Sequence, residues 1–296
     1  MADRKPRCSA TSRAFDEPIA GTASTVTRWV LVEYPGAWAP DAIASRGIPT
    51  WLRQHLESLW ERHRIRVVLV RRRYHEPGTG LRCFAAWTGR DDPWLERTKI
   101  QHLGELLDVD FAPLARGRSV GFDRWPDPLF IVCTHGSHDT CCGLYGRPVA
   151  DALAEWWPRE TWECSHIGGD RFAGNVVCLP RGDYFGRLDR EIAPTVFAGY
   201  LDGRIDLEHY RGRSSYPFAV QAAEVWVRRQ LRLDGIDDVR PLDWRDGTAR
   251  FHVTAEQGGR VVGVRIVSSV HETARFLTCA EVASVHPPTF EVGWQG

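Results

Sequence analysis

The sequence predicts an α/β protein, and three observations support this prediction. Short apolar runs typical of buried strands alternate with segments of helical period, as in layered α/β domains. This pattern starts twice, once near residue 29 and again near residue 128. From residue 232 onward only strand patterns are found. We therefore expect a flexible tail at 1–25, a first α/β domain at 26–125, a second and related one at 126–230, and a small β-rich extension at 231–296.

The first α/β domain is predicted from one helix and three strands. Residues 29–34 form an apolar run that ends at a Pro-Gly pair, as a buried strand ends at a turn. Leucines at helical spacing predict a helix over 51–64. Apolar runs predict two further strands at 66–70 and 81–87.

The second domain begins with an apolar strand at 128–133. A polar, glycine-containing loop from Thr134 to Gly146 follows, and then a helix over about 148–157, whose first turn suits Pro148. The remaining expected elements are strands at 161–164 and 175–180, helices at 192–201 and 219–231, and C-terminal strands at 249–254, 260–268 and 289–294.

The charge and composition of the chain disfavour several classes of function. The 38 basic and 38 acidic residues leave no net charge to drive binding to nucleic acid. No run approaches the ~20 apolar residues of a membrane helix, and residues 1–27 lack the apolar centre of a signal peptide. We therefore expect a cytoplasmic protein without nucleic-acid or membrane partners. In a reducing compartment disulfides do not explain eight cysteines, so metal binding, thiol chemistry or burial must account for them.

Five of these cysteines lie between residues 133 and 178, and two short segments there hold most side chains capable of chemistry. The first segment starts at the end of a strand, and the second surrounds a Gly-Gly turn that lets a bound group approach the backbone. Thiolates and imidazoles on two such loops suit zinc or an iron–sulfur cluster. The candidates are Cys133, His135, His138, Cys141 and Cys142 in the first segment, and Cys164, His166, Gly168, Gly169, Asp170 and Arg171 in the second.

The spacing of these residues does not match a zinc finger, because there is no Cys-x-x-Cys pair. Cys133, Cys142 and His166 with one further oxygen or nitrogen ligand would fit a [2Fe–2S] centre with partly non-thiolate ligation. Asp170 could be a ligand, and it could equally cap the turn or pair with Arg171. We expect His135 and His138 to be loop residues or hydrogen-bond donors. Burial is the expected role of Cys83, Cys178 and Cys279, and Cys8 belongs to the expected tail.

Several strings resemble the sucrase/ferredoxin-like family: Cys133-Thr-His-Gly, Asp139-Thr-Cys-Cys-Gly, Trp162-Glu-Cys-Ser-His-Ile-Gly-Gly and Arg171-Phe-Ala-Gly-Asn. The resemblance covers about residues 26–230. It implies a thioredoxin-like fold that holds a [2Fe–2S] cluster, ligated in fungal members by two cysteines and two histidines of a His-x-Gly-Gly-His motif. By position it implies Cys133, Cys142 and His166 as ligands here. Asp170 replaces the second histidine, and Cys141 or Cys164 are possible substitutes.

The resulting hypothesis is a one-electron carrier without substrate chemistry of its own. It would take an electron from a reductase and pass it to an acceptor protein, neither of which the sequence identifies. Three alternatives stay open. A zinc protein could use the same four residues, a thiol-redox protein could work through Cys141 and Cys142, and an interaction module could have kept the fold without a cofactor.

Overall fold

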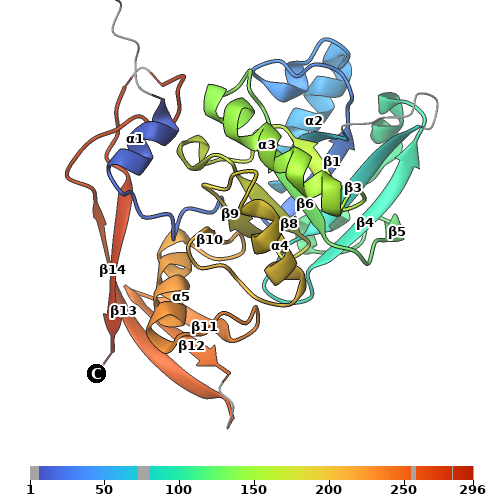
Figure 1. Ribbon diagram of the computed structural model, residues 1–296. Coiled ribbons are helices and arrows are strands. Elements are labelled where there is room, and N and C mark those ends of the chain that lie inside the picture. The colour runs from blue at the N-terminus through green and yellow to red at the C-terminus, as the bar shows by residue number, and fades with distance from the viewer. Residues whose placement is uncertain (1–6, 73–79, 255–257, 282, 296) are drawn as a thin grey trace, which may run out of the picture.

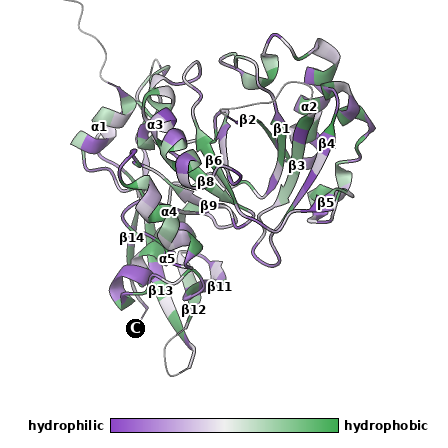
Figure 2. Ribbon diagram, turned by 45° about the vertical axis from the view of Figure 1, so that its right-hand side comes forward, coloured by the Kyte–Doolittle hydropathy of each residue, from purple (hydrophilic) through white to green (hydrophobic). Residues whose placement is uncertain are grey.

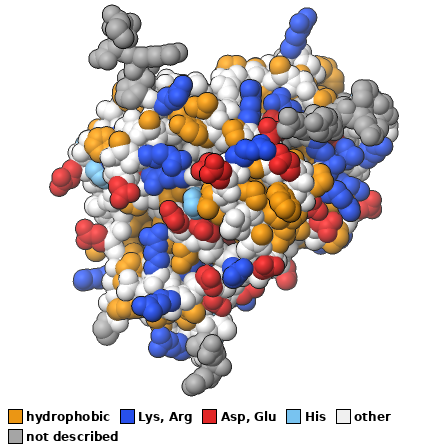
Figure 3. Space-filling view, viewed as in Figure 1, with side chains coloured by type: hydrophobic (Ala, Val, Ile, Leu, Met, Phe, Trp, Pro, Cys, Tyr) orange, Lys and Arg blue, Asp and Glu red, His pale blue; other side chains and the backbone are white. Residues whose placement is uncertain are grey.

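The computed structural model describes residues 7–72, 80–254, 258–281 and 283–295, and it confirms the α/β class. A ten-stranded mixed sheet is accompanied by a four-stranded antiparallel sheet (Figure 1). Basic and acidic side chains are interspersed over the face shown in Figure 3. In the described ranges, no helix has the length and apolar character that a membrane crossing requires.

The first half of the large sheet contains β1 (Arg28–Glu33), β2 (Arg66–Arg71), β3 (Leu81–Trp87) and β4 (Trp94–Ile100). Strand β1 is parallel to β2 and antiparallel to β3, and β4 is antiparallel to β3. Helix α2 (Thr50–His63) connects the two parallel strands. The predicted helix and the three predicted strands are confirmed, whereas β4 was not predicted, because three charged residues lie in its seven positions.

The second half repeats this arrangement with β6 (Leu129–Cys133), β7 (Thr161–Cys164), β8 (Val176–Leu179) and β9 (Asp183–Phe185). The spatial order β9-β8-β6-β7 has the same strand directions as β4-β3-β1-β2. A short antiparallel pairing of β2 with β7 joins the halves into one sheet. The two α/β segments of the sequence therefore share a continuous sheet, whose edges are β5 (Asp123–Arg124) and β10 (Tyr210–Arg213).

Helix α3 (Thr140–Trp156) begins eight residues earlier than predicted. The side chain of Asp139 caps it by accepting a hydrogen bond from the Cys141 backbone nitrogen at 2.8 Å. Cys141 and Cys142 consequently lie in the first turn of a helix rather than in the expected loop. This change of element decides where the two thiols point.

The glycines of this segment explain why the helix start was predicted wrongly. Gly146 looks like a loop residue, but it serves packing, because a Cβ atom there would overlap the carbonyl oxygen of Cys133. Gly143 likewise lies directly against Gly136. Helix α3 can thus approach strand β6 closely, and Pro148 lies inside the helix instead of in its first turn.

The prediction of a flexible tail at 1–25 is wrong for the described part, which starts at residue 7. Residues Cys8–Ala14 form helix α1, and Ile19 and Ala23 are buried. The backbone nitrogen of Ala23 donates to Gln221, far along the chain. The buried face of α1 consists of small residues, so it leaves no apolar period in the sequence. Figure 1 shows α1 beside the C-terminal part of the chain.

The C-terminal part forms a separate sheet that packs against a helix. Its strands are β11 (Val239–Arg245), β12 (Thr248–Val253), β13 (Arg260–Val270) and β14 (Pro288–Trp294). Apolar side chains from these strands and from helix α5 (Phe218–Leu231) form one core cluster. Helix α4 (Ala193–Leu201) instead packs its buried side chains against strands of the large sheet. In Figure 2, hydrophobic residues follow the central strands of the large sheet.

Candidate metal centre

The end of strand β6, the first turn of α3 and the loop after β7 meet at one point. They bring together Cys133, Cys142, His166 and Asp170, which we call the cysteine–histidine site. The potential ligand atoms of Cys133, Cys142 and His166 lie within 4.8 Å of one another. Those of His138, His166 and Asp170 form an overlapping group of the same size. The structure therefore assembles the four residues singled out in the sequence, and it adds His138.

Two polar atoms of this site are buried without hydrogen-bond partners. Asp170 is 1% exposed, and its Oδ1 accepts a hydrogen bond from the Cys142 thiol at 3.0 Å. His166 Nδ1 lies 2.9 Å from the same oxygen, yet it makes no proper hydrogen bond among the described residues, and neither does Asp170 Oδ2. Buried polar atoms without partners are costly. A bound cation would satisfy them, so the donor set fits a metal centre.

The protonation states of the site favour a thiolate beside a charged imidazole. Hydrogen bonds from Cys142 and Cys164 lower the pKa of Cys133 well below its usual value despite burial. The pKa of Cys142 is raised, because the neighbouring Cys133 thiolate, burial and the Asp170 carboxylate all disfavour a second negative charge there. Burial lowers the pKa of His166, but Asp170 and Cys133 outweigh this effect and raise it to about 9. The metal-free site thus has a stabilised thiolate, the form that binds metals.

His135 and His138 differ in whether a ring nitrogen is free. His135 Nδ1 accepts the backbone N–H of His166 at 3.2 Å, so Nε2 must carry the hydrogen that it shares with the Ala39 carbonyl at 2.8 Å. Both nitrogens are used, and His135 holds the loop instead of binding a metal. His138 Nδ1 lies 3.1 Å from the Pro40 carbonyl, which leaves the lone pair on Nε2. That nitrogen lies 3.8 Å from the Oδ2 of Asp170.

The Gly-Gly turn positions His166 and Asp170 through a buried arginine. Gly168 and Gly169 have φ values of 97° and 82°, which favour glycine. A Cβ atom on Gly169 would overlap the guanidinium of Arg211. Arg211 donates to the Gly168 carbonyl at 3.1 Å and to Asn175 Oδ1 at 2.9 Å, and burial lowers its pKa to about 10. Sequence analysis missed Arg211, because it lies outside both cysteine segments and no local pattern marks it.

Two other candidates lie beside the site without entering it. Arg171 pairs with Glu17, Nε to Oε1 at 2.8 Å, and therefore does not serve Asp170 as the sequence allowed. Cys164 is buried and lies opposite Cys133 across the β6–β7 pair. Burial and the nearby Cys133 raise the pKa of Cys164 well above its usual value. It is a thiol that stabilises Cys133, and its sulfur is not in the group of clustered ligand atoms.

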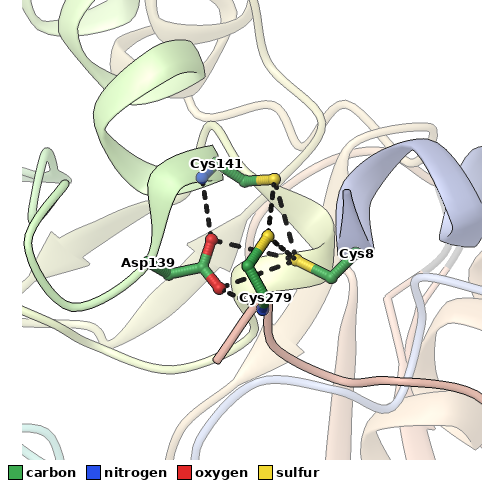
Figure 4. A group of neighbouring side chains, drawn as sticks. All are labelled: Cys8, Asp139, Cys141 and Cys279. Carbon is green, nitrogen blue, oxygen red and sulfur yellow. Dashed lines mark hydrogen bonds between the residues drawn. The ribbon is translucent and has the colours of Figure 1, made fainter. Parts of the chain in front are cut away.

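Cys141 faces away from the cysteine–histidine site. Its sulfur lies 3.7 Å from that of Cys8 and 3.5 Å from that of Cys279 (Figure 4). The expectation that Cys8 lies in a tail is therefore wrong, because it begins helix α1. Cys279, which was expected to be buried, is only half-buried and lies between β13 and β14. Cys83 and Cys178 are buried as predicted.

A hollow of about 330 Å³ covers the histidine side of the site. His138 and His166 have 35% and 25% of their side chains exposed, whereas Cys133 and Cys142 are buried. The site thus has a sulfur side within the protein and an imidazole side toward the surface. Further residues that line the hollow include Pro40, Asp41, Ala42, Ile43, Arg66, Val67, His135 and Ser165.

Known proteins resemble this chain to different extents. Two curated proteins, each called "Altered inheritance of mitochondria protein 32", match part of it. The one from Meyerozyma guilliermondii is 32% identical over 97 residues, 29% of this chain and 34% of the relative. The one from Eremothecium gossypii is 32% identical over 103 residues, 30% of this chain and 33% of the relative. The match thus spans about a third of these relatives' length.

No solved structure matches the chain. The sequence profile of one family, described as sucrase/ferredoxin-like, matches residues 19–212. This range includes both halves of the large sheet up to β10 and every residue of the cysteine–histidine site. Because the match covers well over half of the sequence, the chain belongs to the sucrase/ferredoxin-like family.

Proposed function

We propose that the cysteine–histidine site holds a [2Fe–2S] cluster and that the protein carries single electrons. The observation that carries this proposal is the convergence of two buried thiols and an imidazole within 4.8 Å, beside a buried carboxylate oxygen without a partner. Such mixed sulfur and nitrogen donors suit iron–sulfur centres. The family name, sucrase/ferredoxin-like, agrees with a ferredoxin-like role.

Cys133, Cys142 and His166 would hold the cluster, with Asp170 as fourth ligand. Asp170 Oδ2 is buried and lacks a hydrogen-bond partner among the described residues, so it has a free lone pair. His138 Nε2 is the competing donor, and it is more exposed than Asp170. When bound, the cluster supplies a one-electron redox centre, and imidazole ligation gives a higher potential than four thiolates would.

The chain's own groups keep this centre in place and near the surface. His135 fixes the first loop through two backbone hydrogen bonds. Arg211 fixes the second loop through the Gly168 carbonyl and places a positive charge close to the site. The hollow above His138 and His166 leaves the imidazole side accessible, where a partner protein would approach.

Absorption spectroscopy of anaerobically purified protein tests this function. We expect a reddish-brown protein with about two irons and two acid-labile sulfides per chain, the content of a [2Fe–2S] centre. Chemical reduction should bleach part of the visible absorption, and the bleaching should be complete after one electron per chain has been added. A colourless protein that contains zinc at this site would instead support the zinc alternative. A chain without iron after iron-replete anaerobic expression would contradict the proposal.

A further inference from the structure

Three segments far apart in the chain bring a second group of cysteines together. Cys8 begins helix α1, Cys141 lies in the first turn of α3, and Cys279 lies between β13 and β14. With the carboxylate of Asp139 they form what we call the three-cysteine site (Figure 4). The potential ligand atoms of all four residues lie within 4.8 Å of one another. We propose that this site binds one zinc ion, independently of the cysteine–histidine site.

The sulfur triangle has the dimensions of a single-ion site. The Sγ–Sγ distances are 3.7 Å for Cys8 and Cys141, and 3.5 Å for Cys279 with each of the other two. A tetrahedral zinc with Zn–S bonds of about 2.3 Å has thiolates about 3.8 Å apart. In an iron–sulfur cluster the three cysteines would be divided between different irons. At least two of the three Sγ–Sγ distances would then be longer than around a single ion. The triangle therefore favours one ion over a cluster.

Asp139 completes a tetrahedral donor set. Its two oxygens lie 3.9 and 3.8 Å from the Cys8 sulfur, and both also accept backbone N–H groups, of Cys141 and Cys279. Asp139 is 2% exposed, and no Lys or Arg in the described ranges forms an ion pair with it. The two backbone N–H groups satisfy part of its hydrogen-bonding capacity, and a cation would also neutralise its buried charge. Zinc commonly has such carboxylate and thiolate ligands.

Simple burial of three thiols explains this group poorly. Around Cys8 and Cys141 the apolar cluster contains only Ala173, with Tyr145 and Cys279 packed at its side. A polar group also contacts one of the sulfurs, because the Ser9 hydroxyl donates a hydrogen bond to the Cys141 sulfur at 3.0 Å. A hydroxyl donor stabilises a thiolate, the form that binds zinc. The residues around the sulfurs are thus those of a ligand site rather than a hydrophobic core.

The position of the site indicates a structural role. An ion there would tie α1 and the segment before β14 to the start of α3. Neighbouring residues of a helix point about 100° apart, so Cys141 serves this site while Cys142 serves the cysteine–histidine site. A disulfide is the alternative use of the same atoms, and it would leave one of three thiols unpaired.

Metal analysis of the full chain tests the proposal. In protein purified anaerobically with reductant, we expect about one zinc per chain in addition to any iron. Cys279→Ser should remove this zinc and leave the iron content unchanged. Cys279→His, which restores a zinc ligand, should retain it, and Cys83→Ser, at a buried cysteine outside both sites, should have no effect. Unchanged zinc content in Cys279→Ser would overturn the proposal.

A second measurement separates the two sites and does not require the first to be loaded. In a Cys133→Ser/His166→Ala background, Co²⁺ should bind with the thiolate charge-transfer absorption of a tetrahedral site, and Zn²⁺ should displace it. Adding Cys279→Ser should weaken Co²⁺ binding at least ~10-fold. Absence of the thiolate band, or a disulfide among Cys8, Cys141 and Cys279 in the reduced preparation, would refute a zinc site. Because zinc and iron are counted separately, failure here leaves the proposed cluster untouched, and the reverse also holds.

Discussion

The two cysteine sites take Cys141 and Cys142 from the same helical turn and differ in how the chain builds them. The cysteine–histidine site is made within one half of the large sheet, from residues 133–170. The three-cysteine site is made from α1, α3 and the segment before β14, with partners as far as 271 residues apart. The first site is built within the second α/β half alone. The second site forms only where α1 and the segment before β14 pack against the start of α3.

The two sites also differ in their surroundings and, in our proposals, in their roles. Two histidines of the first site line a surface hollow, which would give a partner protein access to the proposed cluster. In the second site Cys8 and Cys141 are 1% and 0% exposed and Cys279 is half-buried, so most of the sulfur triangle is closed to solvent. Substitutions that affect one site and spare the other are the most direct way to test the comparison.

The largest expected effect is the loss of the cluster in Cys133→Ser. A serine hydroxyl at the end of β6 is a far poorer iron ligand than a thiolate. Visible absorption and iron content should fall to near zero, while the zinc of the three-cysteine site stays. Cys178→Ser is the matched control, because Cys178 is equally buried in the neighbouring strand β8 and outside both sites. Iron retained at the wild-type level in Cys133→Ser would disprove its assignment as a ligand.

The next effect is the dependence of stability on zinc. A ligand present at 100 times its dissociation constant stabilises a fold by about 2.7 kcal/mol. A strong zinc chelator should therefore lower the free energy of unfolding by about this amount in the wild type and not at all in Cys8→Ala. Urea titrations followed by circular dichroism measure the difference. An equal effect of the chelator on both proteins would show that the stabilising zinc is bound elsewhere.

A smaller effect is expected from Gly169→Ala at the turn that holds His166. The left-handed backbone at φ 82° and the overlap with Arg211 should cost about 1–3 kcal/mol. We also expect a lower iron content with unchanged zinc. Gly199→Ala in helix α4 is the control, since nothing lies within 4 Å of a Cβ atom there, and alanine stabilises a helix by roughly 0.5–1 kcal/mol relative to glycine. Equal stability of the two variants would contradict the role of the turn.

The smallest effect concerns the fourth ligand of the cluster. If Asp170 is a ligand, Asp170→His should keep the cluster and shift its potential upward, because imidazole is a neutral donor. His138→Ala should leave the spectrum unchanged. Electrochemistry and electron paramagnetic resonance of the reduced protein measure both. A changed spectrum in His138→Ala with an unchanged one in Asp170→Ala would assign the ligand to His138 instead.

The cysteine–histidine site could be predicted from the sequence because its parts are local. Cys133 ends the apolar strand β6 and His166 follows β7, and neighbouring parallel strands place their ends together. The start of α3 could not be predicted, because Gly146 serves close packing against the Cys133 carbonyl and imitates a loop residue. Arg211 escaped notice for a different reason: its role depends on a fold that brings β10 beneath the Gly-Gly turn.

The three-cysteine site was missed because no local pattern connects its members. Cys8 lies in a seven-residue helix whose buried face is made of small and polar residues. Cys279 lies between two strands without regular structure of its own. Pairs of residues so distant in sequence meet only through the packing of the whole chain. A single sequence contains no signal for that meeting, even though Cys141 itself was a candidate.

In our proposals one chain holds two independent metal centres that share the first turn of α3. The most direct test of this claim is the measurement of iron, acid-labile sulfide and zinc in a single anaerobic preparation of the full chain. The account predicts about two irons, two sulfides and one zinc per chain. A preparation that lacks either iron or zinc after growth with both metals would contradict it.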